Sequence, residues 1–581
     1  MGHVRFEELM GKREKMMEQI EIDEELFNKP AMKDEQNIYL LPTFYLHSQQ
    51  LILANPTIVI TKLAKNFEHY LTTYLYGNIY KAKAFERKIS EALQKVTEVV
   101  DNWSNKNARL LISGSLLLNA HTIGSDVNLV CLTPGERLTR IEFMGNDKNA
   151  KCLQNKCTER TNASLFCRIC EHKSTSNLIK IDSESILLIR FTFDGIEFDI
   201  SLVAVPTMQN LEHKINDNEL ENLLKRFNWS NSEHKHLIRS LSSYRSTLYI
   251  CNLLLYNEMC PKERINIQMD NKDIFNENRR HFRLLLVTLK IWAKNNFIYS
   301  NKMGFLNGMT LAIMVTKIVL LYPNASIQFL LEKFFLFYST RRIQMPVQIA
   351  KINKTDQDLI SNGAFSLLNA KEFDMPTLTP AFPVQNVTRL VTHSNAKVIR
   401  REMIKALTKI KAMDNNNKQF ELAAFLDGSV PFTQKYDNFV VILCIAEQKE
   451  KADAFCGFVE WRMRLQIIFD IDKKGGSIET HLYPDVYQQN CNLPTNFVKP
   501  SFRANFCKVW LLGISSASIS GTINNNLFEM AQQFDTTIKR HYYLKTTKGP
   551  TANQLNVDDY FKAMKMELKS VMAKKEELFG F

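Results

Sequence analysis

The sequence predicts an α+β protein built from several domains. Two segments, 126–131 and 195–203, alternate polar and apolar residues with the period of two that is typical of β-strands. Residues 207–380 instead repeat apolar side chains every three or four positions, which indicates helices. After residue 386 strand-like and helix-like segments alternate again. Three regions of different type therefore follow one another along the 581 residues.

The composition favours a globular protein, and the net charge favours a polyanionic partner. Hydrophobic residues make up 45 % of the chain and charged residues 23 %, both ordinary values. The formal net charge of +13 suits a polyanion such as RNA, although a merely basic surface is the alternative. The longest apolar stretch, 303–321, is interrupted by Asn307 and Lys317. We expect a buried helix there and no membrane partner.

The N-terminal part is expected to contain a leader followed by a sheet domain. Residues 1–55 are charged and predict a leader and helices that pack on the central domain. Apolar spacing over 82–103 predicts an amphipathic helix against the sheet. No apolar signal region is evident near residue 1, so we expect an intracellular protein whose eleven cysteines are mostly reduced.

A short turn near residue 114 has the features of a phosphate-holding loop. The apolar run 109–113 predicts a strand, and Gly114 and Ser115 then open onto a helical turn at 116–118. A strand that enters a helix through Gly-Ser aims backbone N–H groups and a hydroxyl at one spot. This geometry suits an anionic phosphate.

Acidic residues lie in the middle of two predicted strands. Asp126 and Asn128 share one strand face, and Asp199 shares a face with Glu197. A carboxylate in the middle of a strand is costly unless it binds something. Carboxylates on two strands beside a Gly-Ser turn fit a two-metal nucleotidyl-transfer site. Asp126 and Asp199 are thus the predicted ligands of Mg²⁺ or Mn²⁺.

The connection between these strands carries a cysteine cluster in a segment of about residues 145–180. Its spacing is C-x₄-C-x₉-C-x₂-C-x-H, formed by Cys152, Cys157, Cys167, Cys170 and His172. Four thiolates, or three with the histidine, are sufficient for a structural tetrahedral Zn²⁺. Free cysteines in a polar loop and a redox C-x-x-C pair are the alternatives.

The helical region contains two lysines on one predicted helix face. Helices are expected at 219–227, 234–257, 277–296, 304–321 and 327–338. Lys290 and Lys294 are four residues apart and share a helix face, and Tyr299 follows at the helix end. Two ammonium groups in a cleft would neutralise the β- and γ-phosphates of a nucleotide. A solvated lysine pair is the alternative.

These motifs resemble the eukaryotic poly(A) polymerases of the DNA polymerase β-like nucleotidyltransferase superfamily. Three stretches carry the resemblance: the turn and first acid with Gly114-Ser115, His121-Thr122, Gly124 and Asp126; the run 289–308; and the run 375–386. The last is similar to the junction between the central and C-terminal domains of this family. The resemblance covers about residues 40–545.

The resemblance implies a domain organisation. It places a polymerase β-like nucleotidyltransferase sheet at 56–206, with the cysteine segment as an insertion, and a helical central domain at 207–386. An RNA-recognition-like α+β domain would follow at 387–545, with strands at 439–446 and 508–514 and helices at 452–469 and 528–541. Phe458 and Trp461 fall on the first of these helices, so we expect them in the core and not as base-stacking platforms. Residues 546–581 would be a tail.

The resemblance also implies an activity and its residues. The family transfers AMP from ATP to RNA 3′ ends without a template, in the nucleus, together with mRNA 3′-end processing factors. Asp126 would bridge two metal ions, and Asp199 would hold the ion at the 3′-hydroxyl. ATP would be bound by Gly114, Ser115, Lys290, Lys294, Tyr299, Gly304 and Ser242, the last standing where the family has a base-contacting asparagine.

One position departs from the family at the centre of the chemistry. The family motif is Asp-x-Asp, and this chain has Asn128 as a degenerate second acid. Loss of one carboxylate costs about a few kcal/mol of transition-state stabilisation. The sequence therefore supports a polymerase with weak or lost activity. The alternative is an inactive homologue that binds RNA or protein partners, and a basic helical protein without a nucleotide site is a third interpretation.

Overall fold

The computed structural model describes residues 62–578 with internal gaps. The gaps are 77–78, 123, 136–138, 147–151, 154–155, 158–162, 184–185, 206–216, 228–231, 256–271, 324, 343–344, 351–372, 416–424, 427–429, 469–470, 473–477, 490–501, 504, 516–520 and 548–555. The leader expected at residues 1–55 lies outside the described residues. None of the described helices combines the length and apolar character needed to cross a bilayer.

The N-terminal sheet has five strands in the order β1-β2-β7-β6-β5. Their bounds are β1 Arg109–Ser113, β2 Val127–Pro134, β5 Thr175–Ser183, β6 Ile186–Phe193 and β7 Ile196–Val205. β2 and β7 are parallel, and the other pairs are antiparallel. The sheet thereby places the two predicted acidic strands next to each other.

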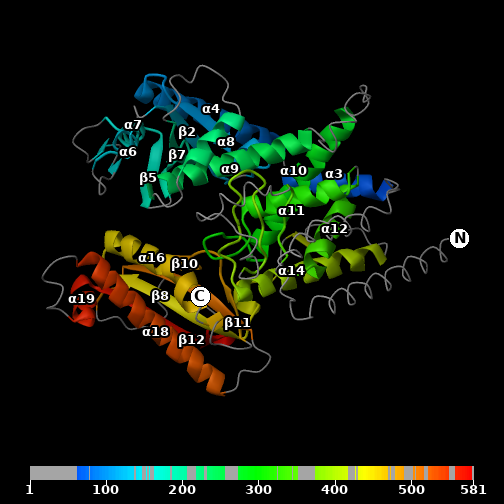
Figure 1. Cartoon of the computed structure of the whole chain (residues 1–581). Coiled ribbons are helices and arrows are strands. Elements are labelled where there is room, and N and C mark those ends of the chain that lie inside the picture. Colours follow the sequence, from blue (N-terminus) through cyan, green and yellow to red (C-terminus); the bar gives the residue numbers. More distant parts are fainter. Residues whose placement is uncertain are drawn as a thin grey trace, which may run out of the picture. The chain divides into compact units, whose positions relative to one another are not determined.

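Alternating side chains divide this sheet into two faces. On one face Val127, Leu129 and Phe198 pack against α4 (Ile79–Ser104) and α7 (Leu165–Glu171). On the other face Leu132 and Val203 pack against α8 (Asp217–Arg226) and α9 (Ser232–Leu255) (Figure 1). Because the period is two, the even-numbered residues of β2 and the odd-numbered residues of β7 point to the α8–α9 side. This is the side on which Asn128 and Asp199 lie.

The central region is helical, as expected. Its helices are α9, α10 (Lys272–Asn295), α11 (Gly308–Leu321), α12 (Ile327–Thr340) and α3 (Lys62–Tyr76), which packs on α10 and α12. α11 is buried almost along its whole length, in agreement with the buried helix expected over 303–321. Asn307 begins this helix, because its side-chain carbonyl accepts a hydrogen bond from the Thr310 N–H at 2.9 Å.

The C-terminal region contains a second sheet, in the order β10-β11-β8-β12, with β9 also paired to β11. The strands are β8 Asn438–Ala446, β9 Glu479–Leu482, β10 Gln488–Gln489, β11 Phe506–Ser515 and β12 Met566–Lys574. Figure 1 shows α16 (Lys449–Met463, continued by a π-helical turn at Arg464–Ile468) and α18 (Gly521–Thr546) lying along this sheet. The expected strands at 439–446 and 508–514 and the expected helices at 452–469 and 528–541 are thus present.

Three features differ from the expectations. Residues 546–581 were expected as a tail, but α19 (Val557–Met564) leads into β12, which pairs with β8 along nine residues. The amphipathic pattern there reflects a half-buried edge strand. The long helix α14 (His393–Asn415) precedes β8 and was not expected. Trp461, expected in the core, is 60 % exposed, although its neighbour Phe458 is buried.

The remaining described elements are short. They are α5 Gly114–Leu117, α6 Arg140–Met144, β3 Cys152–Leu153, β4 Lys156–Cys157, and the 3₁₀ turns at Phe432–Gln434 and Lys575–Leu578. Sheets and helices together confirm the predicted α+β class.

Candidate functional site

The site is organised by one row of residues that runs across the N-terminal sheet. The strand register places Ser113 opposite Asn128, Asn128 opposite Asp199, and Asp199 opposite Arg190. Residues in register on neighbouring strands project from the same face. The predicted catalytic positions 128 and 199 are therefore adjacent, as the sequence indicated. The next residue in the row after Asp199 is a cation, Arg190.

Asp199 is buried and already has a charged partner. Its side chain is 8 % exposed, and Arg190 donates two hydrogen bonds to it, Nε to Oδ1 at 2.7 Å and Nη2 to Oδ2 at 2.6 Å. This bidentate geometry is the strongest form of an arginine–carboxylate pair. The carboxylates of Asp199, Asp126 and Glu197 raise the pKa of Arg190, with the hydrogen bond to Asp199 as the largest cause. Arg190 is therefore held as a cation at the predicted metal site.

Asp126 is exposed and is contacted by the residue that departs from the family motif. The Asn128 amide donates a hydrogen bond to the Asp126 carboxylate, with Nδ2 and Oδ2 3.1 Å apart. Gly114 adopts φ +64, and a Cβ there would lie 3.5 Å from Asn128 Nδ2. The Gly-Ser turn thus lies directly against Asn128. The three predicted catalytic residues form one cluster, which we call the acidic site: Asp126, Asn128 and Asp199.

The turn after β1 forms as predicted. The N–H of Leu118 donates to the Gly114 carbonyl at 3.1 Å, and the N–H of Ala120 donates to the Ser115 carbonyl at 2.9 Å. Ser115 is half-buried. A second tight turn follows, in which the Thr122 N–H donates to the Ser125 hydroxyl at 2.9 Å. These two turns position the start of β2 and therefore Asp126.

Lys290 enters this region from α10. Its Nζ donates a hydrogen bond to the Ala120 carbonyl at 3.0 Å, and the residue is only 6 % exposed. Burial lowers the pKa of Lys290 to about 8, as does the nearby charge of Lys294, while Asp126 opposes the shift. Burial lowers the pKa of His121, and the charges of Arg283 and Lys290 add to this shift while Glu86 opposes it. Lys290 is thus directed toward the turn and the acids.

Lys294 and Tyr299 lie on the same side of α10. The Lys294 ammonium is 5.6 Å from the centre of the Tyr299 ring, a cation–π contact. Burial raises the pKa of Tyr299 to about 12, with a contribution from Asp126, so the phenol is a hydrogen-bond donor at neutral pH. A Cβ on Gly308 would lie 3.4 Å from the Tyr299 hydroxyl and 3.9 Å from Lys290 Cε. The glycine therefore leaves room beside both side chains.

Two further predicted ATP-binding residues contact another part of the chain. Ser242 accepts a hydrogen bond from Gln385 Nε2 at 3.0 Å and donates to the Pro383 carbonyl at 3.4 Å. Gly304 has φ +79, and a Cβ there would lie 2.4 Å from the Leu390 carbonyl oxygen. These contacts of Ser242 and Gly304 are to the connection between the central and C-terminal regions, and the Gly304 carbonyl also accepts a hydrogen bond from Asn395 of α14. Their role toward ATP stays a prediction.

The cysteine cluster is described only in part. β3 and β4 pair Cys152 with Cys157 in register, and Cys167 and Cys170 are buried in α7. Cys170 is disulfide-bonded, and His172 accepts a hydrogen bond from the Ser174 N–H at 3.2 Å. Among the described side chains, no group of three or more His, Cys, Asp or Glu residues is arranged to hold a metal ion. The Zn²⁺ site stays a prediction.

The acidic site offers oxygen donors that suit Mg²⁺ or Mn²⁺, with one restriction. Asp126 is exposed, and the Asn128 amide can present its carbonyl oxygen. Both oxygens of Asp199 accept hydrogen bonds from Arg190. Asp126 and Asn128 therefore fit a divalent ion as they stand. Asp199 becomes available when Arg190, whose side chain is 46 % exposed, turns away.

Arg190 is a residue of the candidate site that the sequence analysis did not predict. A signal for it was present, because Asp194 and Gly195 separate two alternating segments. The structure has a two-residue turn with φ +49 and +77 at these positions. In such a hairpin, residue 193 pairs with 196, which brings residue 190 opposite residue 199.

Comparison with known proteins finds a family match in the central region. Residues 281–424 match the family model "Poly(A) polymerase central domain". This segment contains Lys290, Lys294 and Tyr299.

Similarity to whole proteins extends further along the chain. "Poly(A) polymerase" of Dictyostelium discoideum is 22 % identical over 441 residues, which cover 73 % of this chain and 48 % of that protein. "Nuclear poly(A) polymerase 4" of Arabidopsis thaliana is 23 % identical over 467 residues, covering 77 % and 55 %. The chain thus spans about half the length of these curated relatives.

Solved structures of lower similarity also match. A structure of a mutant Cid1 poly(U) polymerase bound to MgATP is 13 % identical, covers 59 % of this chain and 93 % of that chain, and has a TM-score of 0.37. A second Cid1 structure is 14 % identical over 62 % of this chain and 99 % of that chain, with a TM-score of 0.38.

Proposed function

We propose that this chain, a relative of the poly(A) polymerases, transfers AMP from ATP to RNA 3′ ends at a rate reduced by Asn128. The observation that carries the proposal is the convergence of four groups. The Gly114-Ser115 turn, Asp126 and Asp199 meet on one face of the sheet, and the Lys290 ammonium reaches the end of the turn from α10. Acids that bind metal and cations that bind phosphate are both needed for this chemistry.

The proposed reaction forms one bond and breaks one. The RNA 3′-oxygen attacks the α-phosphorus of ATP, loses its proton, and displaces pyrophosphate as the α–β phosphoanhydride bond breaks. A bound Mg²⁺ or Mn²⁺ would activate the hydroxyl and stabilise the leaving group, held by Asp126 and Asp199.

The chain's own cations would bind the triphosphate. Lys290 is nearly dehydrated, so its charge would act on the phosphates with little screening by water. Lys294 and the Tyr299 hydroxyl would complete the clamp, and Ser115 would contribute its hydroxyl. Asn128, which donates to Asp126, removes one negative charge from the metal site and lowers the expected rate.

We propose further that the chain acts in the same compartment and on the same kind of RNA as its relatives. Two Arabidopsis relatives are named nuclear poly(A) polymerases, which supports a nuclear site of action in mRNA 3′-end processing. The net charge of +13 supports binding to the RNA backbone. We also propose that the cysteine segment holds a structural Zn²⁺ and that the chain contacts processing factors.

A second candidate function is favoured by one specific observation. Arg190 occupies both oxygens of Asp199, and an amide replaces the second acid. A site whose acids are already satisfied by the protein would bind nucleotide or RNA without transferring AMP. The chain would then act as an RNA- or protein-binding factor.

Extension of a radiolabelled oligo(A) primer with ATP, in Mg²⁺ and separately in Mn²⁺, tests the proposal. We expect slow extension by the natural chain and an increase of about a few powers of ten in Asn128→Asp, because the second carboxylate is restored. Asp126→Asn should remove the residual activity and serves as the negative control.

Three outcomes separate the candidates. No extension by the natural chain, with activity gained in Asn128→Asp, supports the binding-factor candidate. No extension by either protein contradicts the proposed reaction. Extension by the natural chain that Asn128→Asp does not improve shows that the missing acid does not limit the rate.

A further inference from the structure

A second cluster of cations lies on the opposite side of α10 from the acidic site. A cavity of about 500 Å³ is lined by residues of α10, α14 and the segment before β8. At 100° per residue, Trp292 lies about 200° around the helix from Lys290 and about as far from Lys294 in the other direction. The cavity is therefore separate from the proposed ATP site, and its volume is typical of small-molecule sites.

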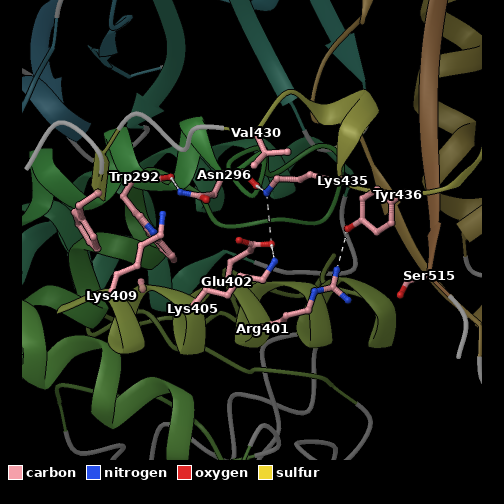
Figure 2. A pocket seen from close by; sticks show the side chains of 12 residues that line it. Trp292, Asn296, Arg401, Glu402, Lys405, Lys409, Val430, Lys435, Tyr436 and Ser515 are labelled. Atoms are coloured by element: carbon pink, nitrogen blue, oxygen red, sulfur yellow. Dashed lines mark hydrogen bonds and ion pairs between the residues drawn. The ribbon is translucent and has the colours of Figure 1, made fainter. Parts of the chain in front are cut away.

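Four cationic side chains line this cavity, which we call the basic pocket: Arg401, Lys405, Lys409 and Lys435. Figure 2 shows Arg401, Lys405 and Lys409 projecting from α14, with Lys435 reaching in from the facing segment. Successive residues of this α14 set are four positions apart, so they share one helix face. The arrangement is a fixed row of positive charge opposite a further cation.

The acidic groups around the pocket balance only part of this charge. Glu402 accepts from Lys405 at 3.1 Å and lies 3.4 Å from Lys435, so one carboxylate serves two ammonium groups. Arg401 pairs with Glu479 at 3.0 Å. Among the described residues Lys409 has no ion-pair partner. Counting these six groups, four positive and two negative charges leave the pocket with an excess of two.

The geometry of the cations favours an occupant in the cavity. Lys435 is 10 % exposed and is also near the Asn296 carbonyl at 3.4 Å, so its ammonium group is fixed at the inner end. Burial is the largest cause of its lowered pKa, and Glu402 opposes the shift. The wall beside the cations is apolar, formed by Trp292, Ala406 and Val430. Such a site presents charge for phosphates and a dry surface for the body of a ligand.

We propose that the basic pocket binds a small organic polyphosphate of nucleotide size. Phosphate groups would lie between Lys409, Lys405 and Lys435, and the uncharged part of the ligand would lie on the apolar wall. Ion pairing with several lysines in a concave site makes each interaction stronger than on an open surface. This binding site is independent of the proposed transfer reaction, because the acidic site contributes none of its residues.

Calorimetric titration of the full chain with inorganic tripolyphosphate tests the proposal. In a Lys294→Gln background, which weakens tripolyphosphate binding at the proposed ATP site, the double variant Lys405→Gln/Lys409→Gln should bind at least tenfold more weakly, because it removes two exposed cations of the pocket. Lys294→Gln alone should keep the binding at the pocket, since Lys294 does not line it. Both substituted lysines of the double variant are exposed, so its unfolding midpoint in urea should stay unchanged.

A matched variant removes the same charge elsewhere. Lys562→Gln/Lys574→Gln lowers the net charge equally on the same region of the chain, at two exposed positions away from the pocket lining. An equal loss of tripolyphosphate binding in this control would overturn the proposal, because it would indicate general attraction by a basic surface. An undiminished affinity in Lys405→Gln/Lys409→Gln would also overturn it.

Titrations with ATP, adenosine and oligo(A) distinguish a small polyphosphate ligand from RNA. In the Lys294→Gln background, ATP should bind at least as tightly as tripolyphosphate, and adenosine alone should bind much more weakly. If oligo(A) depends on Lys405 and Lys409 while tripolyphosphate and ATP do not, the pocket is an RNA contact and the small-ligand proposal fails.

Discussion

The acidic site and the basic pocket lie on opposite sides of α10 and differ in how far their charged groups are paired within the protein. In the acidic site the protein supplies partners to its own carboxylates: Arg190 to Asp199 and the Asn128 amide to Asp126. In the basic pocket two carboxylates face four cations, and Lys409 lacks an ion-pair partner among the described residues. The comparison indicates that the charged groups of the acidic site are largely satisfied internally, whereas the pocket retains charge for a ligand.

The largest expected effect concerns Glu402, which is 4 % exposed and holds the pocket cations together. Glu402→Gln leaves the buried Lys435 without its carboxylate, so we expect a loss of roughly 3 kcal/mol in the free energy of unfolding. Urea denaturation of the full chain measures this loss. Glu447→Gln is the control, because its partner Lys565 is half exposed and such surface pairs contribute at most about 1 kcal/mol.

The outcome also sharpens the comparison. If Glu402→Gln and Glu447→Gln lose equal stability, the pocket cations do not depend on an internal partner for folding. In the folded protein, Glu402→Gln should bind tripolyphosphate more tightly than the natural chain, because an acid that competes with phosphate has been removed. Weaker binding would contradict the proposed role of the pocket.

A smaller effect is expected at the acidic site. Arg190→Gln removes the guanidinium that occupies Asp199 and repels a cation, so Mn²⁺ affinity should rise by roughly ten- to thirtyfold. The free Mn²⁺ signal in electron paramagnetic resonance measures this affinity. Arg140→Gln is the matched control, since Arg140 pairs with Asp182 of the same sheet and has a similar exposure. A decrease in Arg190→Gln would mean that Arg190 positions Asp199 for the metal.

The smallest effect is a pH dependence of ATP binding. The pKa of Lys290 is lowered to about 8, so the cation is present at pH 7 and is largely lost at pH 9. If only the protonated form holds the triphosphate, affinity should fall by about tenfold at most between these pH values. Titration with ATP at both pH values measures the change. Lys290→Arg keeps its charge and should give a flat profile, and an equal fall in this variant would exclude Lys290 as the source.

The linked effect on stability has a definite sign. Burial disfavours the charged form of Lys290, because its pKa lies below the value of an unfolded lysine. The contribution of Lys290 to the free energy of unfolding is therefore more favourable at high pH. As the pH falls from about 10 to about 8 this contribution decreases, and below about pH 8 it is constant.

Much of the acidic site could be predicted because it depends on local pattern. Alternation of side chains places Asn128 and Asp199 on strand faces, and the Gly-Ser turn follows from residue type. Asp126, which the pattern placed within a strand, lies one residue before β2. The spacing of Lys290 and Lys294 likewise fixes a shared helix face. The cross-strand partner Arg190 was predictable in principle from the Asp194-Gly195 turn, but it required the exact register of a hairpin.

Other features depend on contacts between distant segments. The pattern of 566–574 is compatible with a helix or a strand, and its pairing with β8 decides between them. Trp461 lies on a helix whose apolar residues mostly face the sheet, and only packing shows that this one is exposed. Ser242 and Gly304 matched family positions, yet the loop from 383 to 390 lies against both. The sequence pattern alone does not predict that this loop lies against Ser242 and Gly304.

The pairing of β12 with β8 has a consequence for synthesis on the ribosome. β8 ends at residue 446 and β12 begins at residue 566, so the 119 residues between them must be translated before the second neighbour of β8 exists. During that interval at least one edge of β8 stays open, and an open edge is a template for wrong pairing with another chain. The domain that contributes Lys435, Tyr436 and Ser515 to the pocket therefore matures late, and a chaperone holding this edge would protect it.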